Sequence, residues 1–228
     1  MKIVVIGRTK NEERNISRFI EGYREWVDEI LIADGGSTDK TLDIIKEYPD
    51  VGLRNFEPTF EAAPGIIRNP QGKHVNFLIE WAHEREADWI IFDDVDCFPT
   101  QALQEQARKI MESTDLHYIY FYRMYCYLEN QWFPSLNDAG HSIWAWRAGE
   151  LWADEQDPLR LGFSKTRYIP QDQRLKLDFP MAGLHCTWPT EREIQRKMAF
   201  YQACWNTEVP HPTKSFGTLE KLPEWAHD

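Results

Sequence analysis

Three carboxylates stand directly after an apolar run in this sequence. Residues 90–92 read Ile-Ile-Phe, and Asp93, Asp94 and Asp96 follow within four positions. The apolar run predicts a buried strand whose end places these acids at the edge of a sheet. Because side chains two apart point the same way along an extended chain, Asp94 and Asp96 should share one side. Such a pair repels unless a cation joins it, and hard oxygen ligands favour Mg²⁺ or Mn²⁺. A solvated acidic loop is the alternative for an isolated Asp-x-Asp pattern.

The first hundred residues alternate between strand and helix patterns. Strands are predicted at 2–7, 29–33, 51–56 and 89–93, and helices at 11–27, between 37 and 49, and from 75 to 82. A loop rich in Pro and Gly is expected to run to Gly72. This alternation favours a mainly parallel sheet with helices on both faces. Ligands bind such sheets beyond the carboxyl ends of the strands, where Asp34 and the Asp94–Asp96 pair both fall.

The second half of the chain is less regular. A helix is expected around 103–111, a long strand at 117–128, and a further strand, antiparallel to its neighbours, at 142–147. Thr190 and Glu193 form a capping box that opens a helix. Residues 148–182 carry many charges and no clear period, as an acceptor-binding or lid region does.

The length of 228 residues favours one α/β domain with a single core. We expect residues 1–228 to form that domain, with a ligand-binding half at 1–100, a second half at 101–205 and a tail at 206–228.

Composition excludes several classes of protein. The formal net charge of −11 argues against a nucleic-acid partner, because binding to a phosphate backbone relies on clustered Lys and Arg. No apolar stretch approaches the roughly 18 residues that a transmembrane segment needs. The four cysteines show neither zinc spacing nor a dense disulfide pattern, which favours reduced thiols in a cytoplasmic protein. Seven of the ten tryptophans follow residue 130, which favours core packing over stacking against sugar faces.

Four motifs stand in a characteristic order along the chain. They are Arg8-Thr9-Lys10-Asn11-Glu12-Glu13 after the first strand, Asp34-Gly35-Gly36-Ser37-Thr38-Asp39 after the second, Gly72-Lys73-His74-Val75-Asn76 at a helix start, and Asp94-Val95-Asp96 after the fourth strand. In this order they resemble the family 2 glycosyltransferases of the GT-A fold. The resemblance covers residues 1–100. A fainter one reaches Leu184-His185-Cys186-Thr187-Trp188, which is similar to a segment of lipopolysaccharide-core-type members. The resemblance to family 2 glycosyltransferases implies a GT-A-like, Rossmann-type mixed sheet with helices on both faces, in a single domain.

The resemblance implies a nucleotide-sugar donor, with a UDP-sugar favoured. Asp34 would accept a hydrogen bond from the uracil imide, although it could equally cap a turn. The base and ribose pocket would be lined by Thr9, Asn11 and Glu12, and Asn11 could instead cap a helix. Lys73 would neutralise phosphate, unless it is simply solvated.

The resemblance also implies a metal site. Asp94 would face both the ribose and the metal, and Asp96 would bind the metal directly. His185 would be a third ligand, with a structural or exposed histidine as the alternative. Mn²⁺ or Mg²⁺ held there would bridge the diphosphate and stabilise the charge of the leaving group.

Family 2 members are typically inverting, so a carboxylate should deprotonate the acceptor hydroxyl, which a glycan or a lipopolysaccharide-type polysaccharide could supply. Glu155 is the favoured base, with Asp154 and Asp138 as alternatives. The reason is that residues 144–147, Trp-Ala-Trp-Arg, are similar to the strand before the base in core-sugar transferases. That strand usually reads Arg-Leu-Phe-Arg, and only Arg147 is kept here.

Three other functions fit parts of the pattern. A haloacid dehalogenase-type phosphatase also uses Asp-x-Asp, but directly after its first strand. A nucleotidyltransferase would need a Gly-rich phosphate loop after the first strand, where residues 8–13 contain no glycine. A catalytically inactive module that binds nucleotide sugars or glycans could use the Trp-rich second half, although the presence of both Asp94 and Asp96 argues against it.

Overall fold

The computed structural model describes residues 1–56, 61–63, 66–68, 71–128, 130–133, 142–153, 169–188 and 190–205, with short pieces at 212, 219–221 and 223–224. The helices are α1 Ile16–Arg24, α2 Thr41–Ile45, α3 Gln71–Glu84, α4 Gln101–Ser113 and α6 Glu191–Trp205. The strands are β1 Ile3–Thr9, β2 Glu29–Asp34, β3 Val51–Asn55, β4 Glu61–Ala63, β5 Ile66–Arg68, β6 Trp89–Asp94, β7 Cys97–Pro99, β8 Tyr118–Tyr127, β9 Gln131–Trp132, β10 Ser142–Arg147, β11 Arg174–Lys176, β12 Ala182–Trp188 and β13 Glu220–Lys221.

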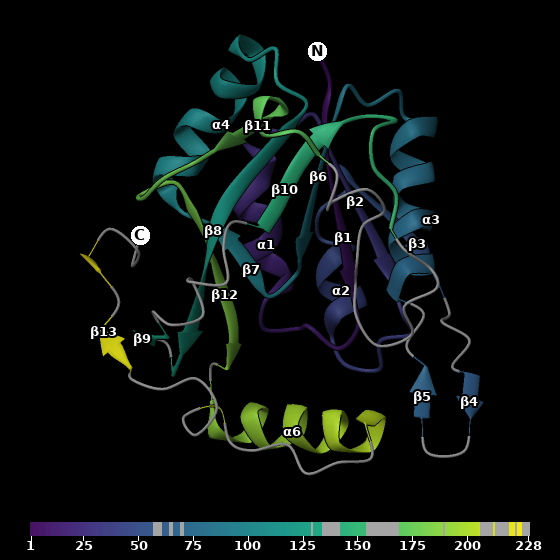
Figure 1. Ribbon diagram of the computed structural model, residues 1–228. Helices are drawn as coiled ribbons and strands as arrows, with labels where there is room; N and C mark the ends of the chain where they lie inside the picture. The colour runs from purple at the N-terminus through teal and green to yellow at the C-terminus, as the bar shows by residue number, and fades with distance from the viewer. Residues whose placement is uncertain are drawn as a thin grey trace.

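One mixed sheet runs through both halves of the described chain (Figure 1). Its order is β13-β9-β8-β10-β6-β1-β2-β3, and β11 and β12 pair with β8. The neighbours β6, β1, β2 and β3 are parallel, whereas β10 is antiparallel to β6 and β8. The predicted mainly parallel first half and the antiparallel strand at 142–147 are therefore confirmed.

Helices cover both faces of this sheet, as predicted (Figure 1). Successive residues of β1 point to opposite faces. Val5 packs with the apolar sides of α1, α2 and α4, whereas Val4 and Ile6 pack with α3. Trp144 packs on the same face of the sheet as Val5, and Trp146 packs on the opposite face with Val4 and Ile6. Both tryptophans are completely buried. Core packing, rather than sugar stacking, explains these two tryptophans.

Local sequence rules misplaced several boundaries. The helix predicted from residue 11 begins only at Ile16, because Asn11 has a positive φ of 59° and its backbone N–H donates to Ser37 Oγ at 2.8 Å. The loop expected before Gly72 contains the antiparallel β4–β5 hairpin, and α3 already begins at Gln71. The three-residue strands β7 and β11 were not predicted, since so short a run carries no readable period.

The Thr190 half of the capping box predicted at α6 is present. The Thr190 side-chain oxygen accepts a hydrogen bond from the backbone N–H of Glu193 at 3.2 Å. Figure 1 shows α6 lying across the molecule beyond the ends of β8 and β12. Within the described residues, no helix combines the length and apolarity that crossing a bilayer would require.

Candidate functional site

The carboxyl ends of β1, β2 and β6 meet at one edge of the sheet. Thr9 is paired with Asp34 across β1 and β2, and Arg8 is paired with Asp94 across β1 and β6. The prediction that one crevice could hold the second and fourth motifs is consistent with this register, because the two strand ends flank β1.

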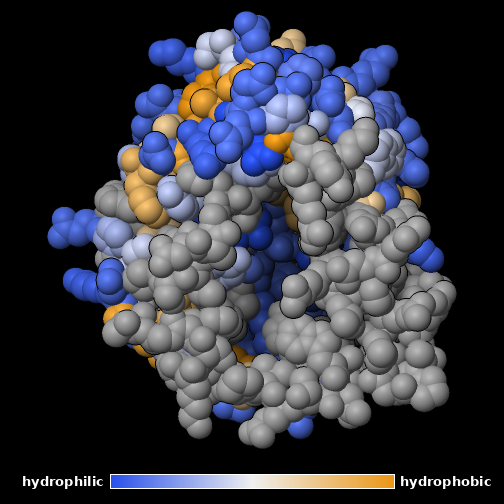
Figure 2. Space-filling model, viewed as in Figure 1, coloured by the Kyte–Doolittle hydropathy of each residue, from blue (hydrophilic) through white to orange (hydrophobic). Residues whose placement is uncertain are grey.

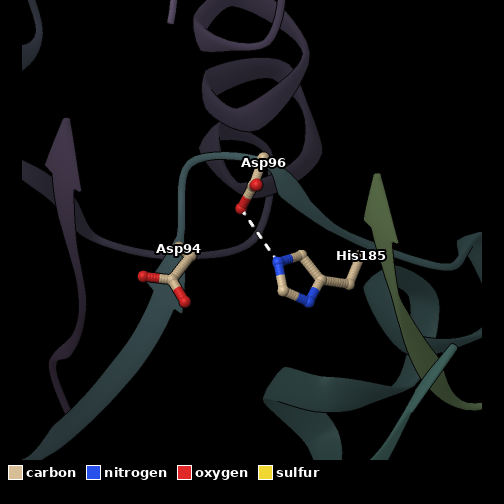
Figure 3. A group of neighbouring side chains, drawn as sticks. All are labelled: Asp94, Asp96 and His185. Carbon is tan, nitrogen blue, oxygen red and sulfur yellow. Dashed lines mark ion pairs between the residues drawn. The ribbon is translucent and has the colours of Figure 1, made fainter. Parts of the chain in front are cut away.

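Asp94, Asp96 and His185 form a compact group of metal-binding side chains (Figure 3). Each offers one ligand atom, and these atoms lie within 4.8 Å of one another. Asp94 is the last residue of β6, and His185 lies on β12, which pairs with β7 just after the acidic motif. Asp96 lies in a turn rather than in the strand. The turn between β6 and β7, and not simple alternation along one strand, therefore brings Asp94 and Asp96 together.

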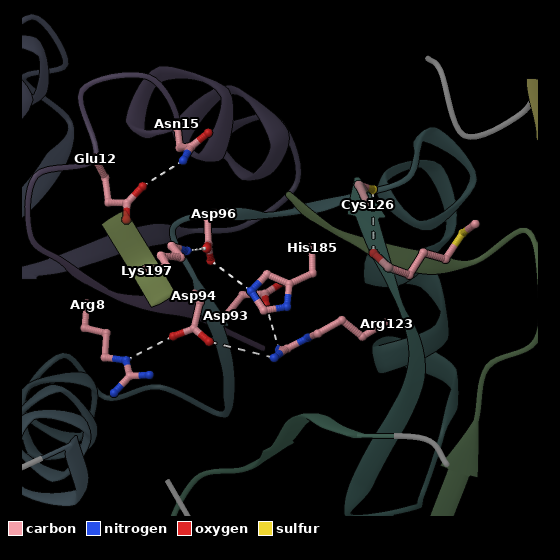
Figure 4. Close-up of polar contacts among 11 residues, drawn as sticks. Arg8, Glu12, Asn15, Asp93, Asp94, Asp96, Arg123, Cys126, His185 and Lys197 are labelled. Carbon is pink, nitrogen blue, oxygen red and sulfur yellow. Dashed lines mark hydrogen bonds and ion pairs between the residues drawn. The ribbon is translucent and has the colours of Figure 1, made fainter. Parts of the chain in front are cut away.

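Asp96 is surrounded by nitrogen donors. Its Oδ1 lies 3.2 Å from His185 Nε2, and its Oδ2 accepts a hydrogen bond from Lys197 Nζ at 2.8 Å (Figure 4). Burial alone would raise the pKa of the Asp96 carboxyl, but the charges of His185 and Lys197 and their hydrogen bonds hold it well below its usual range. Asp96 is therefore ionised at neutral pH, as a metal ligand must be.

Asp94 is neutralised by two arginines. Arg8 Nε donates to Asp94 Oδ1 at 3.0 Å, and Arg123 Nη1 lies 3.8 Å from Asp94 Oδ2. Burial opposes ionisation of Asp94, but these two guanidinium groups outweigh it and lower its pKa. The acidic pair is thus stable in this fold with protein cations beside it.

Asp93 points away from the metal-binding group into the core beside α1. Its carboxylate accepts hydrogen bonds from Tyr23 Oη at 2.7 Å and from Arg123 Nη2 at 3.0 Å. Asp93 is completely buried, and this burial raises its pKa despite the charge of Arg123. Arg123 therefore links the buried Asp93 to the partly buried Asp94 at the end of β6.

The donor set of Asp94, Asp96 and His185 fits a divalent cation. Two carboxylates and one imidazole suit Mn²⁺ well and Mg²⁺ acceptably, since both prefer oxygen ligands and Mn²⁺ also accepts nitrogen. Within the described part of the chain, the buried Nδ1 of His185 has no hydrogen-bond partner. Only one of the two ring nitrogens of His185 therefore has a polar partner among the described residues.

Asp34 has the turn-capping role that its sequence context allowed. It is 1% exposed, and its carboxylate accepts hydrogen bonds from the backbone N–H of Gly36 at 2.8 Å and of Ser37 at 2.9 Å. The Ser37 hydroxyl donates to the other oxygen at 2.5 Å. These bonds shape the loop that follows β2, and a contact between Asp34 and a nucleotide base stays a prediction.

The loop after β1 is fastened to the same turn. Asn11 Oδ1 accepts from the Thr38 backbone N–H at 2.8 Å, so Asn11 caps this turn and not α1. The carboxylate of Glu12 accepts from Asn15 Nδ2 at 2.7 Å. Burial, with a further contribution from Asp96, raises the pKa of Glu12 to about 7. The hydroxyl of Thr9 is buried and has no hydrogen-bond partner among the described residues.

The remaining predicted site residues have no described contact with Asp94, Asp96 or His185. Lys73 is exposed on the first turn of α3. Asn76, about one helical turn after Lys73, binds the backbone N–H and carbonyl of Ala153 at 2.7 and 3.1 Å. The candidate bases Asp138, Asp154 and Glu155 lie outside the described residues.

A cavity of about 240 Å³ lies beside Lys197, the residue that binds Asp96. Residues of the loop after β1, the turn after β2 and the exposed side of α6 line it, among them Asn11, Glu12, Arg196 and Lys197. Figure 2 shows one face of the molecule hollowed, with hydrophilic residues at the floor of the hollow.

Sequence reasoning missed three cations of the site. Arg8 stood in the first motif without an assigned role, and its pairing with Asp94 follows from the register of β1 and β6. No sequence signal marked Arg123 or Lys197, because Arg123 follows Asp94 by 29 residues and Lys197 follows Asp96 by 101 residues along the chain. Only the packing of β8 and α6 against the strand ends brings them there.

Residues 4–186 match the model of the family described as glycosyl transferase family 2, and the chain belongs to that family. The match confirms the predicted family, the GT-A fold and the enzyme class, a glycosyltransferase. It decides against the phosphatase and nucleotidyltransferase alternatives.

Individual relatives are more distant. The chain is 36% identical over 104 residues to a dolichyl N-acetyl-alpha-D-glucosaminyl phosphate 3-beta-D-2,3-diacetamido-2,3-dideoxy-beta-D-glucuronosyltransferase of Methanococcus voltae, covering 43% of this chain and 30% of that protein. It is 24% identical over 103 residues to an uncharacterized protein of Mycobacterium tuberculosis, covering 42% of this chain and 25% of that protein. The matched segment thus spans about a quarter to a third of these curated relatives.

A solved structure shares the fold. The crystal structure of S. aureus TarS, residues 1–349, aligns with a TM-score of 0.59 and 16% identity, and the alignment covers 94% of this chain and 68% of that one. The same S. aureus protein has been solved in complex with UDP, with a TM-score of 0.52 and 15% identity to this chain over the same coverage. At these identities the likeness shows the fold alone.

Proposed function

We propose that this chain transfers a sugar from a nucleotide-sugar donor, with a UDP-sugar favoured, to a hydroxyl acceptor. The observation that carries the proposal is the group of Asp94, Asp96 and His185, which offers three ligand atoms within 4.8 Å at the strand ends. Family membership and the UDP complex of a protein with this fold support the donor class.

Each side chain of the site has a part in this reaction. Asp94, Asp96 and His185 would hold Mn²⁺ or Mg²⁺, which supplies positive charge to the diphosphate leaving group. Arg8 lies beside Asp94 and can add a second positive charge to the same phosphates. Thr9, Asn11, Glu12 and Asp34 would shape the base and ribose pocket, and Lys73 would approach phosphate from α3.

The transfer is proposed to invert the anomeric configuration, with Glu155 as general base and Asp154 or Asp138 as alternatives. The support for this segment is the similarity of residues 144–147 to the strand before the base in core-sugar transferases, and the candidate bases themselves lie outside the described residues. A variant without the general base should lose about 10²–10⁴-fold in turnover. Glu155→Gln and Asp154→Asn, compared at saturating donor and acceptor, identify the base, and the anomeric configuration of the product identifies the stereochemistry.

The acceptor is proposed to be a sugar hydroxyl of a glycan or a lipopolysaccharide-type polysaccharide. The name of the M. voltae relative, a glucuronosyltransferase acting on a dolichyl-linked N-acetylglucosaminyl phosphate, supports a sugar acceptor. The cytoplasmic location stays a prediction from the cysteine pattern alone.

The decisive experiment is calorimetric titration of UDP into the protein with and without Mn²⁺. Tight binding is expected only with Mn²⁺, and Asp96→Asn should abolish the metal dependence while the fold survives. Asp43→Asn removes the same charge from an exposed side chain of α2, which pairs with Lys46, and is the matched control. Metal-dependent UDP binding that persists in Asp96→Asn would contradict the proposed site.

A catalytically inactive module of the same fold is the second candidate. It would bind UDP and a UDP-sugar equally well but release no sugar. Hydrolysis of a panel of UDP- and GDP-sugars in the presence of Mn²⁺, followed by detection of free nucleoside diphosphate, separates the enzyme from the binding module.

A further inference from the structure

Lys197 is a cation bound to the side chain that should bind the metal. Its Nζ lies 2.8 Å from Asp96 Oδ2, while His185 Nε2 lies 3.2 Å from Oδ1, so each oxygen of Asp96 has a nitrogen neighbour (Figure 4). The side chains of Asp96 and Lys197 are only 10% and 21% exposed. Partial burial strengthens the attraction within this pair relative to an ion pair in water.

In this arrangement Lys197 competes electrostatically with a divalent cation for Asp96. Mg²⁺ approaches a carboxylate oxygen to about 2.0–2.1 Å, and the ammonium of Lys197 contacts the same carboxylate. The two cations would lie within a few ångströms of each other in a poorly solvated place, where like charges repel strongly. This repulsion favours displacement of the ammonium group when the metal enters.

The surroundings of Lys197 give it room to move. Its side chain lines the 240 Å³ cavity between α6 and the loop after β1. A lysine has a flexible four-carbon stem, so the ammonium group can shift by several ångströms without a movement of the helix. A diphosphate held by the metal would bring negative charge to the same side of Asp96.

We propose that Lys197 is the counter-ion of Asp96 in the metal-free protein and becomes a phosphate ligand of the nucleoside diphosphate once a divalent cation takes its place. This inference rests on the proposed function, because it assumes that Asp96 binds a metal and that the nucleotide is adjacent. It adds a donor-binding residue from α6 to those at the strand ends.

The first test measures Mn²⁺ binding without nucleotide, from the electron paramagnetic resonance signal of free Mn²⁺. Lys197→Met should bind Mn²⁺ on the order of tenfold more tightly than the wild type, because the ion no longer displaces an ammonium group. Lys197→Arg keeps the charge and should stay close to the wild type. Lys46→Met is the matched control, since Lys46 is exposed directly after α2 and pairs with Asp43 at 3.1 Å. The Mn²⁺ affinity of this variant should change less than about threefold because solvent screens the charge of Lys46.

The second test measures UDP binding by calorimetry at saturating Mn²⁺. Here Lys197→Met should bind UDP on the order of tenfold more weakly, because a charged hydrogen bond to phosphate is lost. One substitution is thus expected to strengthen metal binding and to weaken nucleotide binding. A residue with only a structural role would weaken both.

The outcomes separate the inference from the proposed function. Unchanged or weaker Mn²⁺ binding by Lys197→Met overturns the counter-ion role, and unchanged UDP binding overturns the phosphate role. If Asp96→Asn abolishes Mn²⁺-dependent UDP binding while Lys197→Met behaves as the wild type, only this inference fails. Circular dichroism establishes that each variant is folded, and Lys197→Gln replaces Lys197→Met if the latter is not.

Discussion

Three aspartates within four positions are tolerated because each has a different set of cationic or polar neighbours. Asp94 has Arg8 and Arg123, and Asp96 has His185 and Lys197. Asp93 is the deepest of the three and depends on Tyr23 and Arg123. Burying a carboxylate costs several kcal/mol unless it is paired and hydrogen-bonded, so the partners of Asp93 matter for stability as well as for the site.

Arg123→Met tests this dependence. The substitution leaves Asp93 buried without its guanidinium partner and should lower the free energy of unfolding, measured in urea, by about 3–5 kcal/mol. Adding Asp93→Asn removes the stranded charge and should restore part of the loss. If the two substitutions destabilise additively, the pair does not interact as described.

His74 gives the protein a specific pH dependence. Its Nε2 lies 3.1 Å from the carbonyl of Ala33, the residue before Asp34, and its ring stacks on Phe56. Burial, assisted by Arg8, lowers the pKa of His74 from 6.5 to about 4. The unfolded chain therefore binds a proton below pH 6.5 that the folded chain does not bind until about pH 4. The contribution of His74 to the free energy of unfolding is fully present above pH 6.5 and is lost as the pH falls from 6.5 to about 4.

We expect this linkage to remove about 2 kcal/mol of stability between pH 7.5 and pH 5. His74→Gln keeps a hydrogen-bonding group but cannot titrate. Between pH 7.5 and pH 5 the variant should therefore lose about 2 kcal/mol less of its free energy of unfolding than the wild type loses. Urea unfolding of both proteins at the two pH values gives the comparison. Parallel loss of stability in the two proteins would contradict the assignment to His74.

At the scale of elements, close approach of β12 to β7 and β8 places His185 beside Asp96. Gly183, two residues before His185, has no room for a side chain: a Cβ there would overlap the ring of Phe121 and lie 3.2 Å from Cys97 Sγ. Glycine is needed at position 183 because β12 lies so close to Phe121 of β8 and Cys97 of β7, and not because the backbone there has a positive φ.

Gly183→Ala should therefore destabilise the protein by about 1–3 kcal/mol through overpacking and should also weaken Mn²⁺ binding by displacing His185. Phe121→Leu in the same chain makes space for the added methyl group. The double variant should be less destabilised than the sum of the two single variants, as measured by thermal or urea unfolding. Strict additivity would mean that the clash is relieved elsewhere.

Regular elements were predictable because their periodicity is local. The strands at residues 3–9, 29–34 and 89–94 and the helix from Thr190 onward carry clear apolar patterns or a capping box. The turn that brings Asp94 and Asp96 together was not predictable in detail, since β7 has only three residues. The approach of Arg123 and Lys197 depends on tertiary packing across many residues, which single-sequence patterns do not encode.

At the scale of the whole molecule, the two predicted halves share one sheet. The junction is β10, which pairs with β6 from the first half and with β8 from the second. Trp144 and Trp146 of β10 are buried in the cores on opposite faces, among residues of both halves. Neither half could expose this surface to water without losing a large apolar contact, since burying each large side chain contributes about 1.5–3 kcal/mol.

This shared core predicts that the two halves unfold together. Native-state hydrogen exchange at increasing urea should give one common free energy of opening for amides in β1 and β6 and in β8 and β10, because the same global event exposes them. Trp144→Ala removes a contact with Trp26 of the first half, whose ring centroid lies 6.0 Å away, and should lower that common value by about 3–5 kcal/mol in both halves. Peptide-resolved mass spectrometry measures both halves in one experiment. If the substitution lowers protection in β8 and β10 but leaves β1 and β6 unchanged, the halves are separate cooperative units, and the single-domain prediction is wrong.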